Sequence, residues 1–423
     1  MSTINIGLIG FGIVGTGVAK ILLEQGSQIG ARLGKQVVLQ KIVDLDITRD
    51  RGIKLPDGIL STNVDDIIKN PDIHIVVEVI GGVKPAGDFI ISSLKNGKHV
   101  VTSNKEVIAK CGREIFDAAK ENGVNVFYEA AVGGGIPILR PLNKCLAANK
   151  IEEVCGIVNG TTNYILSKMT KEGRDFGDIL REAQEAGFAE ADPSSDIEGF
   201  DAQYKVKILT SLAYGVDVEL DDIYREGISR VSAADIEYAN EFGYVIKLLA
   251  IAKDTENGLD VRVHPTMIPA DHALAGVNGA FNAIFVHGNN VGETMFYGPG
   301  AGMLPTASAV VADMLDLAAD PSYRMRNIIQ PDKKPLNISE IKSKYYLRLS
   351  VADKPGVLAS ITAILGNQQV SILTVLQKGV QDGVAELIII TDVVPENQIQ
   401  SAIKEMTKLN VVHEVANLIR VGL

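Results

Sequence analysis

A glycine-rich turn directly after a short apolar run constrains the fold of this chain more than any other feature. The run covers residues 4–9, and the turn that follows reads Gly10, Phe11, Gly12, Ile13, Val14 and Gly15. Where such a turn joins a strand to a helix, the first glycine makes the bend, the second lets the backbone approach a pyrophosphate, and the third allows close packing. The pattern predicts a dinucleotide site at the start of the helix, whose free N–H groups favour phosphate.

The rest of residues 1–132 repeats the alternation of strand and helix. Four further apolar runs are expected strands, at residues 37–43, 73–80, 99–101 and 124–127. Nearly continuous apolar strands separated by helices are typical of a parallel sheet with both faces covered. We therefore expect an α/β, Rossmann-type doubly wound domain that binds NAD or NADP.

The residues after the second strand leave the choice between NAD and NADP open. Asp44 ends that strand, later in the chain than the usual spacing of about 20 residues for a ribose-binding acid. An acid there favours NAD, whereas Arg49 and Arg51 just beyond it suit the 2′-phosphate of NADP. A solvated loop explains the two arginines equally well.

Two further domains are predicted. Residues 133–329 begin with a glycine-rich turn into an expected helix, and expected strands at 151–158 and 261–268 bracket several helices, which indicates an α+β substrate-binding and dimerisation domain. Its second glycine-rich turn, before an apolar helix at 309–317, is expected either to return the chain to the nucleotide domain or to be a simple tight connection. A polar, proline-bearing linker is expected at 330–344. Residues 345–423 are expected to form strands and helices in the order βαββαβ, which is ferredoxin-like. They contain no group of residues typical of a catalytic site, so ligand binding or dimerisation is the favoured role.

Residues 187–205 combine five carboxylates with one lysine. They are Glu190, Asp192, Asp196, Glu198, Asp201 and Lys205. The last two lie four positions apart, on one face of a helix expected over 200–214. An exposed ion pair, worth about 0.3–0.5 kcal/mol, is the ordinary explanation. Here the same face continues into leucines at 209 and 212, so we expect the pair to be buried or to line a cleft, where charges are kept for a function.

Composition excludes several classes of function. The net charge of −11 and the lack of a basic block argue against nucleic-acid binding. No apolar run approaches the roughly 18 residues of a membrane span, and the first residues do not read as a signal peptide. The three cysteines lack the spacing of a zinc site or a disulfide framework, so we expect a reduced, cytoplasmic protein.

Over its full length the chain resembles the homoserine dehydrogenase family. The most specific segment runs from Ala183 to Lys205, with Gly187, Asp192-Pro193, Asp196, Gly199 and Asp201 at fixed spacing. Further similar segments are residues 10–15, 102–105, 128–137 and 159–164. Residues 345–423 resemble an ACT domain, with Asp353-Lys-Pro-Gly356 at its first strand–helix junction. Because the nucleotide domain stands at the start of this sequence, we expect the monofunctional form, without an aspartate-kinase segment.

The resemblance implies reversible reduction of L-aspartate 4-semialdehyde to L-homoserine by NAD(P)H. An alkoxide formed by hydride addition needs a proton and positive charge nearby. Lys205 matches the family's proton donor, and Lys105 is a second candidate, or else a ligand of the substrate. Glu190 and Asp201 match positions that bind the amino acid. Asp196 is expected to support the substrate site by orienting it, with a loop-capping aspartate as the alternative.

The resemblance also implies cofactor and cation contacts. Besides the first turn, Asp44 and Arg49, the expected cofactor contacts are Thr102, Ser103, Lys105, Gly187 and Gly302. A monovalent cation, sodium or potassium, is expected at the carboxylate of Glu129 and the backbone carbonyls of Val132, Gly134 and Ile136. Without the resemblance, that segment reads as an ordinary turn with a capping glutamate.

The ACT unit implies feedback inhibition, with L-threonine as the expected effector, and a homodimer or homotetramer. Pure dimerisation is the alternative role of this unit. One rival for the whole chain is a thioester-forming dehydrogenase, which would need Cys145 or Cys155 as nucleophile. A second rival is a nucleotide-binding regulator without turnover.

Overall fold

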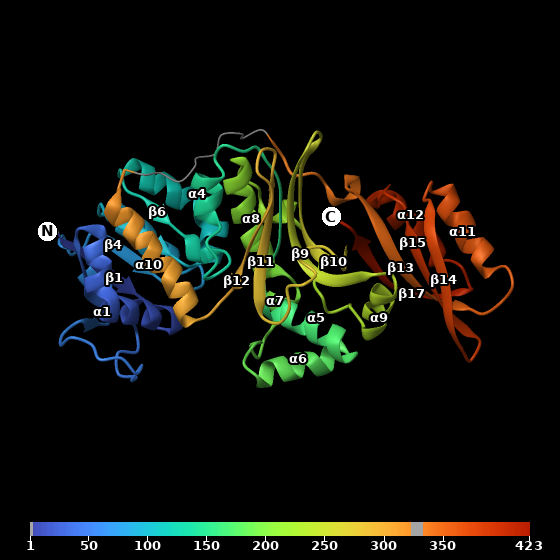
Figure 1. Ribbon diagram of the computed structural model, residues 1–423, viewed down its shortest axis with the longest axis horizontal. Helices are drawn as coiled ribbons and strands as arrows, with labels where there is room; N and C mark the ends of the chain where they lie inside the picture. The colour runs from blue at the N-terminus through green and yellow to red at the C-terminus, as the bar shows by residue number, and fades with distance from the viewer. Residues whose placement is uncertain (1–2, 323–332) are drawn as a thin grey trace. The chain divides into compact units, whose positions relative to one another are not determined.

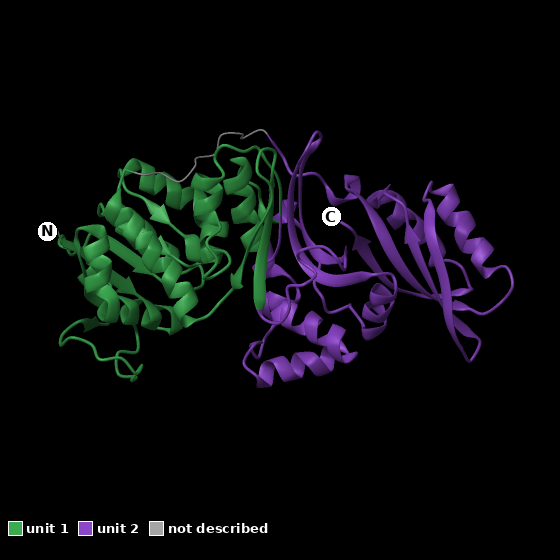
Figure 2. Cartoon of the chain, viewed as in Figure 1, with its two compact units in different colours: residues 1–154, 204–220, 281–332 green, residues 155–203, 221–280, 333–423 purple. Residues whose placement is uncertain are grey.

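The computed structural model describes residues 3–322 and 333–423, and its segments group into two compact units (Figure 2). Unit 1 comprises residues 1–154, 204–220 and 281–332. Unit 2 comprises residues 155–203, 221–280 and 333–423. Among the described residues, no helix has the length and apolar character needed to cross a membrane.

Unit 1 is built on a six-stranded, fully parallel sheet. Its order is β3-β2-β1-β4-β5-β6, from Leu60–Ser61, Gln36–Val43, Thr3–Ile9, Ile75–Glu78, His99–Thr102 and Val126–Phe127. This is the strand order of the Rossmann fold, in which the order reverses beside β1. The parallel sheet and the doubly wound fold expected from the apolar runs are confirmed.

Helices cover both faces of this sheet. They are α1 (Ile13–Leu33), α2 (Asp65–Ile68), α3 (Ala86–Lys95), α4 (Lys105–Glu121) and α10 (Met303–Ala319). Helix α1 packs against α10, side by side in Figure 1, and α3 packs against α4. Core side chains of α1, α10 and the strands form one apolar cluster, which includes Leu8, Val18 and Met314.

Helix α10 therefore joins the nucleotide-binding unit, although it lies far along the chain. It begins at Met303, six residues before the expected start. A Cβ on Gly17 of α1 would lie 2.6 Å from the carbonyl oxygen of Met303, so the two helices approach as closely as glycine permits. The boundary expected at residue 132 consequently does not separate the two compact units, because the chain returns to unit 1 twice.

Unit 2 contains a long mixed sheet. Its strands follow the order β9-β10-β17-β13-β15-β14, from Tyr244–Thr255, Gly258–Pro269, Val412–Val421, Lys342–Ala352, Val384–Thr391 and Ile372–Gln381. Short strands β8 (Tyr224–Arg225) and β16 (Val394–Pro395) pair with β10 and β13. The helices of this unit include α5 (Gly160–Glu172), α6 (Phe176–Glu185), α7 (Ser194–Ile197), α9 (Ala233–Glu241), α11 (Val357–Asn367) and α12 (Glu396–Met406).

The order β13-α11-β14-β15-α12-β17 confirms the predicted βαββαβ unit. It is joined to the rest of unit 2 through hydrogen bonds between β17 and β10. Asp235 of α9, which is fully buried, adds a polar anchor: it accepts hydrogen bonds from Arg348 Nε at 2.7 Å and Asn417 Nδ2 at 2.8 Å. The C-terminal unit is thus an integral part of the sheet.

Three local expectations differ from the structure. The glycine-rich turn at 133–137 leads to a short π-helical turn, Pro141–Cys145, instead of directly to an α-helix. The expected linker is ordered in its second half: the N–H of Leu336 bonds the carbonyl of Leu259 at 2.7 Å and β13 begins at Lys342. Residues 330–332 lie outside the described part. The hairpin β11–β12 (Phe281–Gly288 and Gly292–Pro299) was not expected.

Candidate active site

The first glycine-rich turn has the geometry that a pyrophosphate site requires. Gly10 has φ +101°, and a Cβ there would lie 2.7 Å from Ile80. A Cβ on Gly15 would lie 2.0 Å from the carbonyl oxygen of Gly10. By contrast, nothing lies within 4 Å of a Cβ on Gly12, which precedes α1 and leaves its first N–H groups without a side-chain cap. Gly10 and Gly15 are tightly enclosed, whereas Gly12, the second glycine of the turn, is open at the position where phosphate binds in this fold.

Asp44 and Arg51 flank this turn. The Asp44 carboxylate accepts the N–H of Phe11 at 2.5 Å, and Arg51 lies 3.5 Å from the same carboxylate. The guanidinium of Arg51 stacks over the Phe11 ring, 4.7 Å from its centroid, and donates to the Phe11 carbonyl. Arg49 is exposed. Of the two arginines, Arg51 is the one that the structure places against the turn.

The carboxyl ends of β4 and β5 carry a connected polar group. The hydroxyl of Thr102 donates to the buried carboxylate of Glu78 at 2.7 Å, and burial raises the pKa of that carboxyl. Asn104 caps α4 by accepting the N–H of Val107, and its amide donates to the carbonyl of Gly82 at 2.7 Å. Lys105 therefore begins α4 at the sheet edge where ligands bind in this fold.

The acidic segment folds as a loop, a short helix and the start of α8 (Phe200–Tyr214). Gly187, with φ +76°, ends helix α6, and the amide of Gln184 holds the loop by donating to the carbonyl of Glu190 at 3.0 Å. The Glu190 side chain is exposed. Asp192 accepts two hydrogen bonds from Ser194, which lower the pKa of its carboxyl.

Asn159 links two of the acidic side chains of this segment, Asp196, which is partly buried, and Asp201, which is buried. Its side-chain amide donates to Asp196 Oδ1 at 2.7 Å and to Asp201 Oδ2 at 2.9 Å. Its carbonyl oxygen accepts the N–H of Thr162 at 2.9 Å and so caps helix α5. Only 6% of Asn159 and 3% of Asp201 is exposed. The amide thus fixes both carboxylates at the head of α8.

Helix α8 carries Asp201 and, one turn later, Lys205, which is 8% exposed. The expectation that this pair is buried is confirmed. Within unit 1, α8 lies beside α4: Lys110 sits 5.3 Å from the ring centroid of Tyr204, and Arg113 pairs with Asp217 at 2.7 Å. Lys205 follows Tyr204 directly, so both candidate lysines lie on helices that contact each other in unit 1.

The Glu129 carboxylate lies in a nest of backbone N–H groups. Three consecutive residues donate to it, Ile138 at 2.6 Å, Leu139 at 2.8 Å and Arg140 at 2.7 Å. Burial raises the pKa of this carboxyl in spite of these bonds. The backbone N–H of Glu129 donates to Asp313 at 2.7 Å; burial and the Glu129 charge raise the pKa of Asp313 to about 7.

The carbonyls of Val132, Gly134 and Ile136 were expected to bind a cation. These residues are buried, and among the described residues no donor bonds their carbonyl oxygens. Buried carbonyls without a donor are costly, so a cation would suit them. The described part of the chain contains no cluster of three or more His, Cys, Asp or Glu side chains that could hold a metal ion.

The predicted residues divide between the units. The first glycine turn, Asp44, Lys105, Glu129, Lys205 and Gly302 belong to unit 1, whereas Gly187, Glu190, Asp196 and Asp201 belong to unit 2. Gly302 precedes α10, the helix that packs against α1. Of the rival nucleophiles, Cys155 is buried and Cys145 is exposed. The site prediction omitted Asn159, although the motif that contains it was noted.

Three sequence profiles together cover most of the chain. The profile of homoserine dehydrogenase matches residues 137–315, that of the homoserine dehydrogenase NAD-binding domain matches residues 10–129, and that of the ACT domain matches residues 345–411.

Similar proteins cover the chain almost end to end. A homoserine dehydrogenase of Neisseria gonorrhoeae is 44% identical, with 99% of each chain aligned, and one of Bacillus subtilis is 40% identical over 100% of this chain and 99% of its own. The crystal structure of a homoserine dehydrogenase from Thiobacillus denitrificans superimposes with a TM-score of 0.95 at 43% identity, covering 100% of this chain and 98% of that one. A hyperthermophilic archaeal homoserine dehydrogenase in complex with NADPH gives 0.63 at 29% identity, over 74% of this chain and 97% of that one.

These matches agree with the Rossmann sheet, the glycine turn and the βαββαβ unit described above. The chain belongs to the homoserine dehydrogenase family, a family of oxidoreductases, and carries its NAD-binding domain and a C-terminal ACT domain.

Proposed function

We propose that this chain catalyses the reversible NAD(P)H-dependent reduction of L-aspartate 4-semialdehyde to L-homoserine in the cytoplasm, on the route to threonine and methionine. The observation that carries the proposal is the end-to-end identity with homoserine dehydrogenases, joined to an open phosphate turn at the start of α1. The rival regulator without turnover has no support from these relatives. A thioester mechanism would require a base beside a cysteine, and the relatives that match are not enzymes named for that chemistry.

Lys205 is the proposed proton donor. The bound nicotinamide supplies the hydride, and the aldehyde oxygen then develops negative charge that a nearby ammonium stabilises and protonates. Burial of Lys205 on a helix that contacts α4 suits this role, because the low dielectric strengthens its interaction with the oxygen. Lys105, at the start of α4, is the second cation at the reacting oxygen or a ligand of the substrate.

The substrate's ammonium group is proposed to bind the carboxylates of Glu190 and Asp201. Asp201 is fixed by Asn159, and Asp196 shares the same amide, so Asp196 acts by orienting the clamp. Glu198 accepts a hydrogen bond from Ser229 at 2.6 Å and, like Asp192, has a role within the loop. Gly187 and Gly302 are proposed to approach the cofactor through their backbones.

Replacement of Lys205 by alanine is expected to reduce kcat for homoserine oxidation by about a hundredfold to ten-thousandfold, the usual contribution of a general acid–base group. Binding of NAD(P)H, followed by nicotinamide fluorescence, should stay within about twofold. Lys205→Arg keeps the charge but donates its proton poorly, so it should recover little of the lost activity. Lys207→Ala, on the same helix, is the matched control. Near-normal turnover of Lys205→Ala would contradict the assignment.

The cofactor's adenosine ribose is proposed to bind between Asp44 and Arg51. Asp44 suits the 2′-hydroxyl of NAD, and the guanidinium of Arg51, stacked on Phe11 beside the turn, suits the 2′-phosphate of NADP. The archaeal relative in complex with NADPH supports NADP as one of the two cofactors.

Arg51→Ala is therefore expected to lower the ratio of kcat/KM for NADP over NAD by about tenfold or more, because a charge-assisted contact to the 2′-phosphate is lost. Asp44→Ala should shift the ratio the other way. Steady-state rates with homoserine and each cofactor measure both. Arg49→Ala, whose side chain is exposed on the same loop, should shift the ratio less; equal shifts for Arg49 and Arg51 would contradict the placement.

A monovalent cation, sodium or potassium, is proposed at Glu129 and the carbonyls of Val132, Gly134 and Ile136. The support is chemical: hard cations prefer oxygen ligands, and three buried carbonyls there receive no hydrogen bond from described residues. Each oxygen of the Glu129 carboxylate can accept two hydrogen bonds, and its three donors leave room for one further contact. The ion's role is structural.

The ACT domain is proposed to bind L-threonine at the strand–helix junction Asp353–Gly356 and to pair with another copy, in a homodimer or homotetramer. Gly356 immediately precedes helix α11 in a left-handed conformation, φ +89°, and nothing lies within 4 Å of a Cβ placed on it. Strand β14, at the edge of the sheet, exposes Leu373, Val375 and Val380, as an interface strand would.

Threonine is expected to lower the initial rate of the full-length enzyme. Asp353→Ala should raise the half-inhibitory concentration by about tenfold or more, since a carboxylate contact to the effector's ammonium is lost, while KM for homoserine stays within about twofold. Point variants are preferred to truncation, because β17 is hydrogen-bonded to β10. A threonine-independent rate for the unmodified enzyme would remove threonine as the effector.

A further inference from the structure

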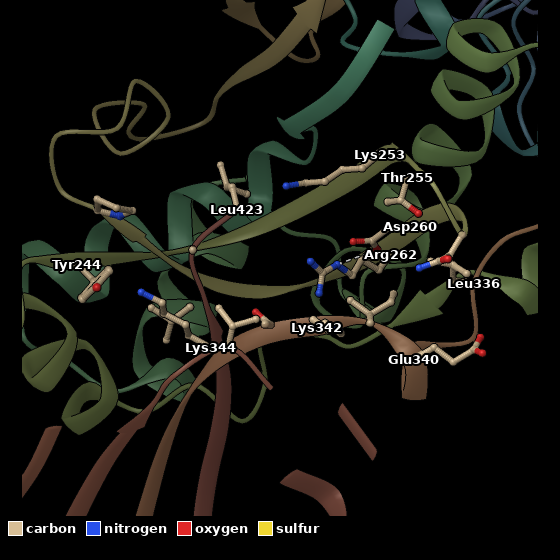
Figure 3. A pocket seen from close by; sticks show the side chains of 17 residues that line it. Tyr244, Lys253, Thr255, Asp260, Arg262, Leu336, Glu340, Lys342, Lys344 and Leu423 are labelled. Carbon is tan, nitrogen blue, oxygen red and sulfur yellow. Dashed lines mark ion pairs between the residues drawn. The ribbon is translucent and has the colours of Figure 1, made fainter. Parts of the chain in front are cut away.

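Unit 2 contains a pocket of about 550 Å³ that none of the roles above uses. Its walls come from strands β9, β10 and β13, the segment before β13, and the residues after β17 (Figure 3). We call it the β10–β13 pocket. Neither the first glycine turn nor the ACT junction at 353–356 contributes to its lining. Its size is typical of a small-molecule site.

The pocket has a buried guanidinium in its wall. Arg262 is 4% exposed, and its Nε lies 3.0 Å from Oδ1 of Asp260, which is two residues earlier on the same face of β10. Neither Nε nor Nη1 of Arg262 donates a hydrogen bond to any described residue. Two buried guanidinium nitrogens that donate no hydrogen bond are costly, and an oxyanion is the group that an arginine fork binds best.

Further cationic side chains surround the guanidinium. Figure 3 shows Asp260 and Arg262, joined by their ion pair, between Lys253 and the strand that carries Lys342 and Lys344. Of the two acidic side chains in the wall, Asp260 is paired with Arg262, and Glu340 accepts the backbone N–H of Asn337 at 3.2 Å. The wall therefore favours an anion.

The other lining groups suit a small organic molecule. Leu336, Ile341 and Val393 supply apolar surface, while Thr255 and Tyr244 offer hydroxyls. We propose that the β10–β13 pocket binds a small metabolite through a carboxylate or phosphate group placed on the Arg262 guanidinium and flanked by Lys342 and Lys344. Because β13 is the first strand of the ACT domain and β10 lies outside it, a ligand here would contact both parts of unit 2.

Calorimetric titration of the full-length protein with inorganic phosphate and, separately, with succinate tests the proposal. Every titration contains saturating NADP⁺, so that the phosphate turn of unit 1 is already occupied and does not bind the probe. Saturable binding of at least one probe, at one site per chain, is expected, and the better probe shows whether a phosphate or a carboxylate fits. Lys342→Gln with Lys344→Gln should weaken binding by about tenfold, because two charge contacts are lost.

The matched control is Lys404→Gln with Lys408→Gln, which removes the same charge from exposed positions in and just after helix α12. It should bind the probe as the unmodified chain does. Arg262→Lys keeps the charge but loses the two-pronged guanidinium, so it should also weaken binding of the probe. If this buried variant fails to fold, the Lys342/Lys344 variant alone tests the proposal. No saturable binding of either probe, or equal affinity in the Lys342/Lys344 variant, would overturn the proposal.

Discussion

A single side-chain amide, that of Asn159, fixes the geometry on which the proposed chemistry depends. An asparagine amide has two donors and two acceptor positions, and here both donors go to carboxylates and the oxygen accepts from Thr162. Asp196 and Asp201 would repel each other if they were held close without a shared donor. The amide offsets that repulsion and ties the acidic loop to the cap of α5, so the start of α8 is held in place.

The rest of the proposed site follows from the elements that carry it. Helix α8 presents Asp201 and, one turn later, Lys205, and Tyr204 of this helix contacts Lys110 of α4, which begins with Lys105. The carboxyl edge of the parallel sheet supplies the turn for the cofactor. Three buried carboxylates here have hydrogen-bond donors: Asp201 has Asn159, Glu78 has Thr102, and Glu129 has three backbone N–H groups. Such pairing is what makes buried charge tolerable.

Local patterns in the sequence predicted the elements well. The glycine spacing gave the turn and α1, the apolar runs gave the parallel strands, and helical spacing placed Asp201 and Lys205 on a face that is indeed buried. These features depend on neighbours within a few residues, which a sequence displays directly.

Contacts between residues far apart in the sequence could not be predicted from such local patterns. Asn159 is hydrogen-bonded to carboxylates that lie 37 and 42 residues later in the sequence, and Asp313 accepts a hydrogen bond from Glu129, which lies 184 residues earlier. Likewise, the pairing of β17 with β10 and the return of α10 to the nucleotide unit are set by packing in three dimensions. Arg51, and not Arg49, lies against the glycine turn because its guanidinium stacks on the Phe11 ring. The sequence places both arginines in one loop and does not show which of them makes this contact.

The central claim is that Asn159 orients the substrate clamp at the head of the helix that carries Lys205. The most direct test compares kcat/KM for homoserine with the dissociation constant of NADPH in Asn159→Ala, using Thr170→Ala on the same helix as a control. We predict a loss in kcat/KM of about tenfold or more, since two hydrogen bonds to charged groups disappear, with NADPH affinity within about twofold. An unchanged kcat/KM in a folded Asn159→Ala enzyme would contradict the account.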